Sequence, residues 1–121
     1  MLHGTLQGFI DDIEYGYYVR NTREYGENSV KRGGWLFEDS GEGEPTYKYL
    51  NDILVADLII KNENRTWARY IPRMEKAVEA FLSHSSEIDL EPDEWPVMIE
   101  IAQRVKDNLP NIQIVPDGKE F

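Results

Sequence analysis

Residues 47–60 read YKYLNDILVADLII, and this stretch decides which fold class the chain adopts. As a helix, it places four large apolar side chains on one face, namely Tyr47, Leu50, Leu54 and Leu58. As a buried strand, residues 53–60 form a run rich in β-branched side chains that Asp57 interrupts. We favour the helix, which the polar residues 62–64 are expected to end.

Upstream of this stretch, the sequence predicts a first short helix. Five apolar residues recur there at three- and four-residue spacing: Leu6, Phe9, Ile10, Ile13 and Tyr17. The spacing predicts a helix over about 5–15, with Thr5 able to cap its start and Gly16 placed near its end.

The region between these two helices is expected to be largely irregular. Residues 17–34 are polar and contain three glycines, which indicates a loop or a loose extended segment. Residues 35–37, Trp-Leu-Phe, are typical of a short strand. Residues 38–45, EDSGEGEP, form an acidic turn in which two glycines and Pro45 exclude regular structure.

Two more helices are predicted downstream. Pro72 disfavours a helical Ile71, so the first should start near Pro72 and close near 83–86, with one apolar face made of Met74, Val78, Phe81 and Leu82. The second should begin around 92–96, where prolines and acids suit a first turn, and Pro110 should stop it. Its apolar face comprises Met98, Ile101, Ala102, Val105 and Leu109.

Residues 112–115, Ile-Gln-Ile-Val, then read as a short strand. The expected fold is α+β: a small, helix-dominant single domain of residues 1–121 with a short β-sheet or hairpin. An all-α fold is the alternative.

Charge is the most unusual property of the chain, because 23 acidic residues against 13 basic ones give a net charge of −10. The acids are concentrated in three stretches without a single Lys or Arg: residues 1–19, 33–47 and 77–103. A strongly negative protein attracts positive partners and repels nucleic acid and anionic membranes. We therefore expect a basic protein partner, with no direct contact to nucleic acid or membrane.

Composition also restricts the compartment and the chemistry. There is no cysteine, which excludes disulfides, thiolate zinc sites and cysteine nucleophiles. The N-terminal residues carry no positively charged region of the kind found in a signal peptide, and no apolar run approaches the length of a membrane span. These features fit a soluble cytoplasmic protein.

Two acidic stretches, each beside a Trp, are candidate partner-binding surfaces. The first surface contains Glu38, Asp39, Glu42 and Glu44, next to Trp35 and Phe37. The second contains Glu87, Asp89, Glu91, Asp93, Glu94 and Trp95. Charge raises the association rate and an aromatic anchor supplies affinity. In the competing interpretation, Ile88, Leu90 and Trp95 belong to the core and the acids are simply solvated.

The sequence gives little evidence for a metal site or for nuclease chemistry. Neither acidic stretch has the spacing of a helix-loop-helix calcium site, which needs a central glycine. Pro92-Asp93 and Asp117-Gly118-Lys119 match the letters of a restriction-type nuclease motif. That motif needs its carboxylates on neighbouring strands, whereas Asp93 is expected to open a helix. No metal and no cofactor are therefore expected.

Acid–base and nucleophilic catalysis find equally little support. His3 lies near a terminus, and His84 falls at a predicted helix end, where the helix dipole favours histidine. No Gly-x-Ser-x-Gly elbow and no Gly-rich phosphate loop is present. We expect no catalytic residue.

One basic cluster departs from this pattern. Arg65, Arg69 and Arg73 recur every four residues around Trp67 and Tyr70. On one continuous helix they would form a stripe suited to phosphate or a carboxylate partner, but Pro72 is expected to interrupt it. We favour pairing of these arginines with acids of the same chain.

These properties favour a non-catalytic, acidic protein-binding module. In composition the chain resembles bacterial toxin-immunity proteins and, less closely, phage proteins that mimic DNA. The resemblance implies an inhibitor that neutralises a basic toxin, such as a nuclease with a positive active-site cleft. The alternatives are a small enzyme with carboxylate- or metal-assisted chemistry, a DNA mimic that inhibits a host nucleic-acid enzyme, and an adaptor whose acidic face maintains solubility.

Overall fold

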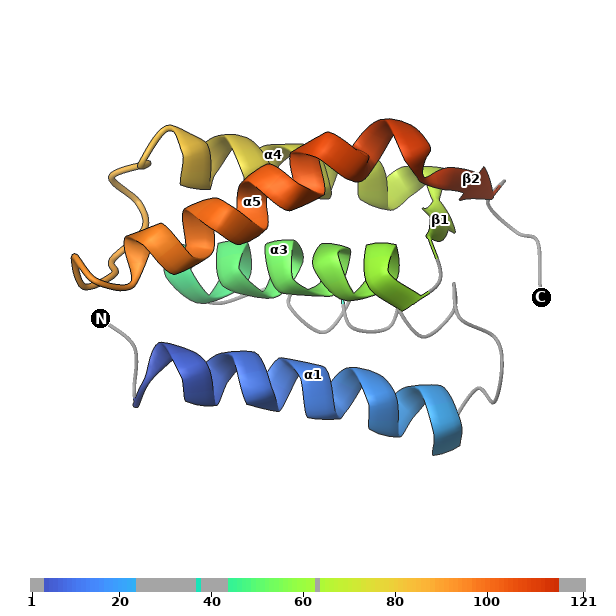
Figure 1. Ribbon diagram of the computed structural model, residues 1–121, viewed down its shortest axis with the longest axis horizontal. Coiled ribbons are helices and arrows are strands. Elements are labelled where there is room, and N and C mark those ends of the chain that lie inside the picture. Colours follow the sequence, from blue (N-terminus) through green and yellow to red (C-terminus); the bar gives the residue numbers. More distant parts are fainter. Residues whose placement is uncertain (1–3, 24–36, 38–43, 63, 116–121) are drawn as a thin grey trace.

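The computed structural model describes residues 4–23, 37, 44–62 and 64–115. In chain order its elements are α1 (Leu6–Arg23), α3 (Pro45–Asn62), β1 (Arg65–Trp67), the 3-10 turn η1 (Ala68–Tyr70), α4 (Ile71–Leu82), α5 (Trp95–Asn108), the 3-10 turn η2 (Leu109–Asn111) and β2 (Gln113–Val115). Helix α3 lies in the middle, with α1 on one side and α4 and α5 on the other (Figure 1). The helix-dominant α+β fold is confirmed, and the all-α alternative is wrong because β1 and β2 form a sheet.

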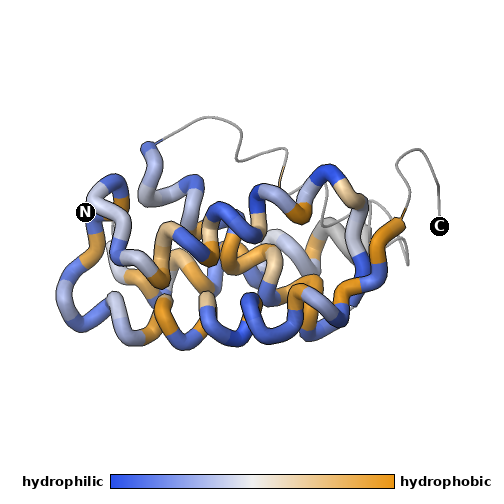
Figure 2. Tube along the Cα trace, turned by 90° about the horizontal axis from the view of Figure 1, so that it is seen from above, coloured by the Kyte–Doolittle hydropathy of each residue, from blue (hydrophilic) through white to orange (hydrophobic). Residues whose placement is uncertain are grey.

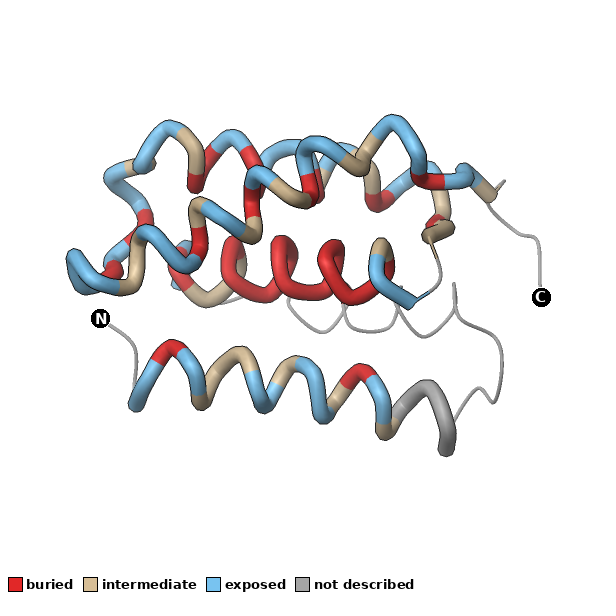
Figure 3. Tube along the Cα trace, viewed as in Figure 1, coloured by how far each residue is buried: buried red, intermediate tan, exposed pale blue. Residues whose placement is uncertain are grey.

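Residues 47–60 are helical throughout, within α3. Every residue from 49 to 59 is buried, so all sides of the helix are covered (Figure 3). A helix that is apolar on all sides belongs in the interior, where packing outweighs the β-preference of its branched residues.

The expectation that Pro45 excludes regular structure is wrong. Pro45 is the first residue of α3, where a proline costs no hydrogen bond, and the Glu44 carbonyl accepts the Lys48 N–H at 3.1 Å.

Helix α1 is longer than the predicted 5–15. Its start is as expected, because the Thr5 hydroxyl accepts the Gly8 N–H at 3.0 Å. Its end is not, because α1 continues through Gly16 to Arg23 and includes the first part of the expected loop 17–34. A mid-helix glycine costs about 1 kcal/mol relative to alanine. Complete burial of the next residue, Tyr17, offsets that cost.

Helices α4 and α5 agree closely with the sequence interpretation. Both pack on α3 and on each other. The buried residues on the predicted apolar faces are Met74, Val78, Phe81, Met98, Ala102 and Val105. Helix α4 also buries Ala77 and Ala80, which were not part of the predicted face. Hydrophobic and hydrophilic residues alternate along the helices (Figure 2), as expected when one face of each meets the core. Ile71 is helical despite preceding a proline, because η1 leads directly into α4 and Pro72 lies in its first turn.

The sheet is a parallel pair of three-residue strands at the end of the bundle where α3 ends (Figure 1). The expected strand at 112–115 is confirmed as β2, and its partner β1 was not predicted. Arg65 pairs with Gln113, and the Gln113 N–H donates to the Asn64 carbonyl at 2.9 Å. Asn64 itself has a positive φ of 54°, a conformation that asparagine tolerates. The sheet is thus a crossover pair, not a hairpin.

Of residues 24–43, only Phe37 is described. It is helical and completely buried, so the strand expected at 35–37 is wrong at this residue. Its ring stacks on Tyr70, with centroids 4.9 Å apart. The rest of the predicted loop, Trp35, Leu36 and residues 116–121 lie outside the described residues.

Candidate functional site

The acids predicted as partner contacts lie mainly in the linker 83–94 between α4 and α5. Four of the linker carboxylates are exposed and one is half-buried: Glu87, Asp89, Glu91 and Asp93 are exposed, and Glu94 is half-buried. Glu44, from the other predicted surface, is exposed just before α3. The remaining three predicted acids, Glu38, Asp39 and Glu42, lie outside the described residues.

The linker contacts the start of α3, two residues after Glu44, although the two bonded residues lie 43 positions apart in the sequence. The Asp89 N–H donates a hydrogen bond of 2.8 Å to the hydroxyl of Thr46, a buried residue in the first turn of α3. The linker therefore lies at the end of the bundle where α3 begins (Figure 1). We call Glu44 and the five linker carboxylates the acidic end.

Alternation of buried and exposed residues explains how the linker presents its charge. Ile88 and Leu90 are buried, whereas Glu87, Asp89 and Glu91 are exposed. In an extended segment, successive side chains point in opposite directions. The two apolar side chains therefore anchor the linker to the core and leave the three carboxylates facing solvent. This agrees with the interpretation that Ile88 and Leu90 are core residues.

Two carboxylates of the acidic end lie at the start of α5. One Glu94 oxygen accepts the Glu91 N–H at 2.8 Å, in the turn that leads into α5. Negative charge near a helix N-terminus is favourable by about 0.3–1 kcal/mol. The dipole of α5 therefore gives a structural role to Glu94, which is the N-cap residue, and to the adjacent Asp93. Glu87 and Asp89 precede this turn, so the α5 dipole does not explain them.

Trp95 and His84 form an aromatic pair beside these carboxylates. Trp95 is half-buried, with its ring centroid 6.2 Å from that of Phe81 and 4.6 Å from that of His84. His84 has a φ of 52° and ends α4 in a Schellman arrangement: its own N–H reaches the Phe81 carbonyl at 3.1 Å, and the next N–H reaches that of Ala80 at 2.8 Å. The prediction that His84 terminates a helix is confirmed, and its contact with Trp95 supports a conformation that usually favours glycine.

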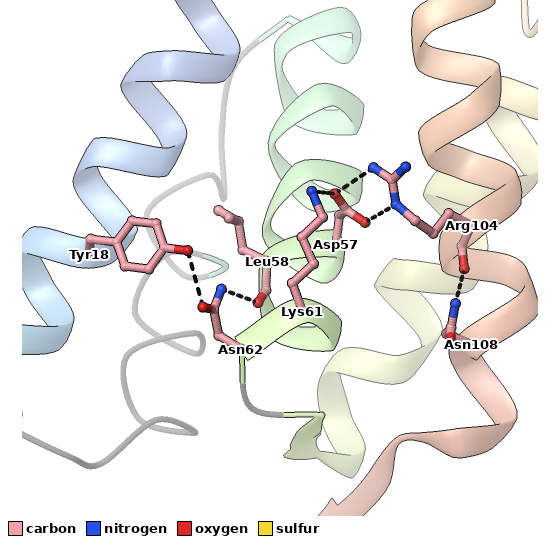
Figure 4. Close-up of polar contacts among 7 residues, drawn as sticks. All are labelled: Tyr18, Asp57, Leu58, Lys61, Asn62, Arg104 and Asn108. Atoms are coloured by element: carbon pink, nitrogen blue, oxygen red, sulfur yellow. Dashed lines mark hydrogen bonds and ion pairs between the residues drawn. The ribbon is translucent and has the colours of Figure 1, made fainter.

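Sequence reasoning missed a buried carboxylate on α3, Asp57, which binds two cations (Figure 4). Its side chain is 6% exposed. Arg104 of α5 donates two hydrogen bonds to it, of 2.8 and 2.9 Å, and the Lys61 ammonium lies 3.1 Å away. The pKa of the Arg104 guanidinium is raised above its usual value, mainly because Asp57 accepts these hydrogen bonds. An acid within an apolar run, four residues before a lysine, was the available signal.

A second buried carboxylate, Asp52, holds α3 against α4. Arg73 donates to its two oxygens at 2.7 and 3.3 Å and also to the Phe37 carbonyl at 2.6 Å. The expected pairing of arginines with acids of the same chain is thus confirmed for Arg73. Each of the two buried carboxylates accepts hydrogen bonds from one arginine through both of its oxygens. This is the geometry of a structural ion pair and not of a reactive acid.

The arginine stripe considered in the sequence does not form. Arg65 belongs to β1, Arg69 to η1 and Arg73 to α4, so no single helix carries all three. The Arg69 guanidinium lies over Trp67, 4.7 Å from the ring centroid, and 5.3 Å from that of Tyr70. These stacking contacts give Arg69 a role within the fold.

Within residues 4–23, 37, 44–62 and 64–115, no group of three or more His, Asp or Glu side chains is arranged to hold a metal ion. No helix in the same part of the chain has the length and apolar character needed to cross a membrane. Comparison with protein families, curated proteins and solved structures finds no match to this chain.

Proposed function

We propose that this chain is a non-catalytic protein-binding module: an immunity or inhibitor protein that neutralises a basic toxin, such as a bacterial nuclease domain, in the cytoplasm. The single observation that carries the proposal is the acidic end. Six carboxylates from two distant segments gather there beside the half-buried Trp95, and the linker that supplies five of them contains no Lys or Arg.

A surface on which all charges are negative raises the rate at which the protein associates with a positively charged partner. Electrostatic steering raises association rates by about 10–10³-fold, and the effect falls steeply with salt. A toxin that cleaves nucleic acid needs a positive cleft to bind its substrate. An inhibitor that covers such a cleft therefore benefits from a concentrated negative surface.

Rigidity of the acidic end favours tight binding. Ile88 and Leu90 are buried, and the Asp89 N–H is bound to Thr46. Carboxylates on an anchored backbone lose less conformational freedom when a partner binds than carboxylates on a loose loop. Trp95 adds an aromatic surface that is already fixed by Phe81 and His84.

The test needs the partner and a matched pair of charge variants. Pull-down from the native host, at low and at moderate salt, identifies a candidate basic partner. Its association rate is then measured by stopped-flow fluorescence. The first variant, Glu87→Gln/Asp89→Asn/Glu91→Gln, removes three charges from the acidic end. The control, Asp11→Asn/Asp12→Asn/Glu14→Gln, removes three charges from exposed positions on α1.

The linker variant should associate about tenfold more slowly at low salt and show a weaker salt dependence. The α1 control should change the rate much less, although the net charge of both variants is the same. Equal slowing by the two variants would mean that only the overall charge matters. No slowing by either would contradict the proposed role of the acidic end.

A further inference from the structure

A basic pocket lies between α3 and α4, in a chain whose net charge is −10. It has a volume of about 290 Å³ and is lined by Lys48, Tyr49 and Asp52 from α3 and by Pro72, Arg73 and Lys76 from α4. Three of its residues are cationic and one is anionic. None of them belongs to the acidic end.

The net charge of the pocket depends on which of its charged side chains are paired with each other. Asp52 is 4% exposed and binds Arg73 through both carboxylate oxygens, so these two opposite charges largely cancel. Arg73 is also held by the Phe37 carbonyl, which fixes its guanidinium in place. The net charge of the lining is therefore that of the two lysines.

Neither lysine is neutralised within the part of the chain that the structure describes. Lys48 is half-buried and Lys76 is exposed, and neither forms an ion pair with any residue there. The Lys76 ammonium lies 6.0 Å from the centroid of the Tyr49 ring, a longer and weaker contact than an ion pair. Two unneutralised ammonium groups on one pocket repel each other, and an anion bound between them relieves that repulsion.

We propose that this pocket binds a phosphate group, either free or as the monoester of a small molecule. A phosphate carries close to two negative charges at neutral pH and matches two lysines, which bind it as point charges. Pockets for drug-sized ligands occupy about 300–1,000 Å³, so a volume of about 290 Å³ suits a smaller ligand. The inference goes beyond the proposed inhibitor function and does not depend on it.

The experiment is an NMR titration of the full-length ¹⁵N-labelled protein, first with inorganic phosphate and then with glycerol phosphate. Sodium chloride at matched ionic strength is the reference. Saturable shifts should appear at the backbone amides of the lining residues other than Pro72, which has no N–H, with a Kd of about 1 mM. Similar affinity for both ligands identifies a site for the phosphate group alone. Tighter binding of glycerol phosphate identifies a site for a phosphorylated small molecule.

Single substitutions locate the binding. Lys48→Gln and Lys76→Gln should each weaken phosphate binding about fivefold, since each removes one direct charge–charge contact. Lys106→Gln, which removes an exposed lysine of α5, is the matched control and should leave the affinity unchanged. All three positions are outside the core, so melting temperatures should stay close to that of the wild type.

Three results would overturn the proposal. One is the lack of saturable shifts up to tens of millimolar phosphate. Another is an identical response to sodium chloride alone. The third is an equal loss of affinity in the Lys106→Gln control. None of these results bears on the acidic end or on the association rates measured there.

Discussion

Loss of Arg104 alone is expected to destabilise the fold, because it would leave the buried Asp57 carboxylate without its main partner. In the variant Arg104→Met, the Asp57 carboxylate, 6% exposed, loses the two hydrogen bonds of 2.8 and 2.9 Å. Removing one partner of a fully buried pair costs about 3–5 kcal/mol. Two features of the structure reduce this value.

The first feature is the exposure of Arg104, whose side chain is 37% accessible, so that part of its charge is already screened by solvent. The second is Lys61, whose ammonium stays 3.1 Å from Asp57. We therefore expect Arg104→Met to lower the free energy of unfolding by about 2 kcal/mol. The double variant Asp57→Leu/Arg104→Met removes both charges, and a cavity of about 70 Å³ beside Asp57 gives the leucine room. It should lie within about 1 kcal/mol of the wild type.

Urea denaturation followed by circular dichroism measures these differences. Lys106→Met, an exposed position on the same helix, is the control and should stay within about 0.5 kcal/mol of the wild type. A free energy of unfolding for Arg104→Met equal to that of this control would show that the loss of Arg104 has no cost. A double variant as unstable as Arg104→Met would show that the cost does not come from an unpaired buried carboxylate.

Two further predictions concern the attachment of α1 and of the linker. Tyr17→Ala removes a completely buried ring and should lower the free energy of unfolding, measured by urea denaturation, by about 3 kcal/mol. Tyr15→Ala, at a position that is 68% exposed, is the control and should lower it by less than about 0.5 kcal/mol. Equal costs would mean that Tyr17 does not hold α1. Thr46→Val leaves the Asp89 N–H without its acceptor and should cost about 1 kcal/mol, with faster hydrogen exchange at the Asp89 amide. The Ile88 amide, which donates to Ser85, is the internal control, and unchanged exchange at Asp89 would show that the Thr46 bond is not formed.

Local sequence patterns predicted the elements whose stability depends on near neighbours in the chain. The spacing of Leu50, Leu54 and Leu58 identified α3, and prolines and acids identified the start of α5 within the range 92–96. The end of α1 was wrong because Gly16 was expected to stop the helix. The position at which α1 ends depends on the burial of Tyr17 by residues distant in the sequence, which no local pattern records.

Features that join distant segments could not be predicted for the same reason. Strand β1 has three residues and is defined by its partner at 113–115. The pairs Asp52–Arg73 and Asp57–Arg104 connect different helices, although an acid within an apolar run was visible in the sequence. The acidic residues of the linker were identified, but their position beside the start of α3, marked by the hydrogen bond between Asp89 and Thr46, is a long-range contact that no local pattern records.

The small parallel sheet has a consequence for the order of folding. Pairing of Arg65 with Gln113 closes a loop of 48 residues, the difference between their positions, and this loop contains both α4 and α5. Closing a loop of that length has an entropic cost. The free energy gained from three residue pairs offsets this cost only in part. The strands can therefore pair only after α4 and α5 have docked on α3 and brought their ends together. The sheet is thus expected to form late, and its loss to be an early step when the bundle opens.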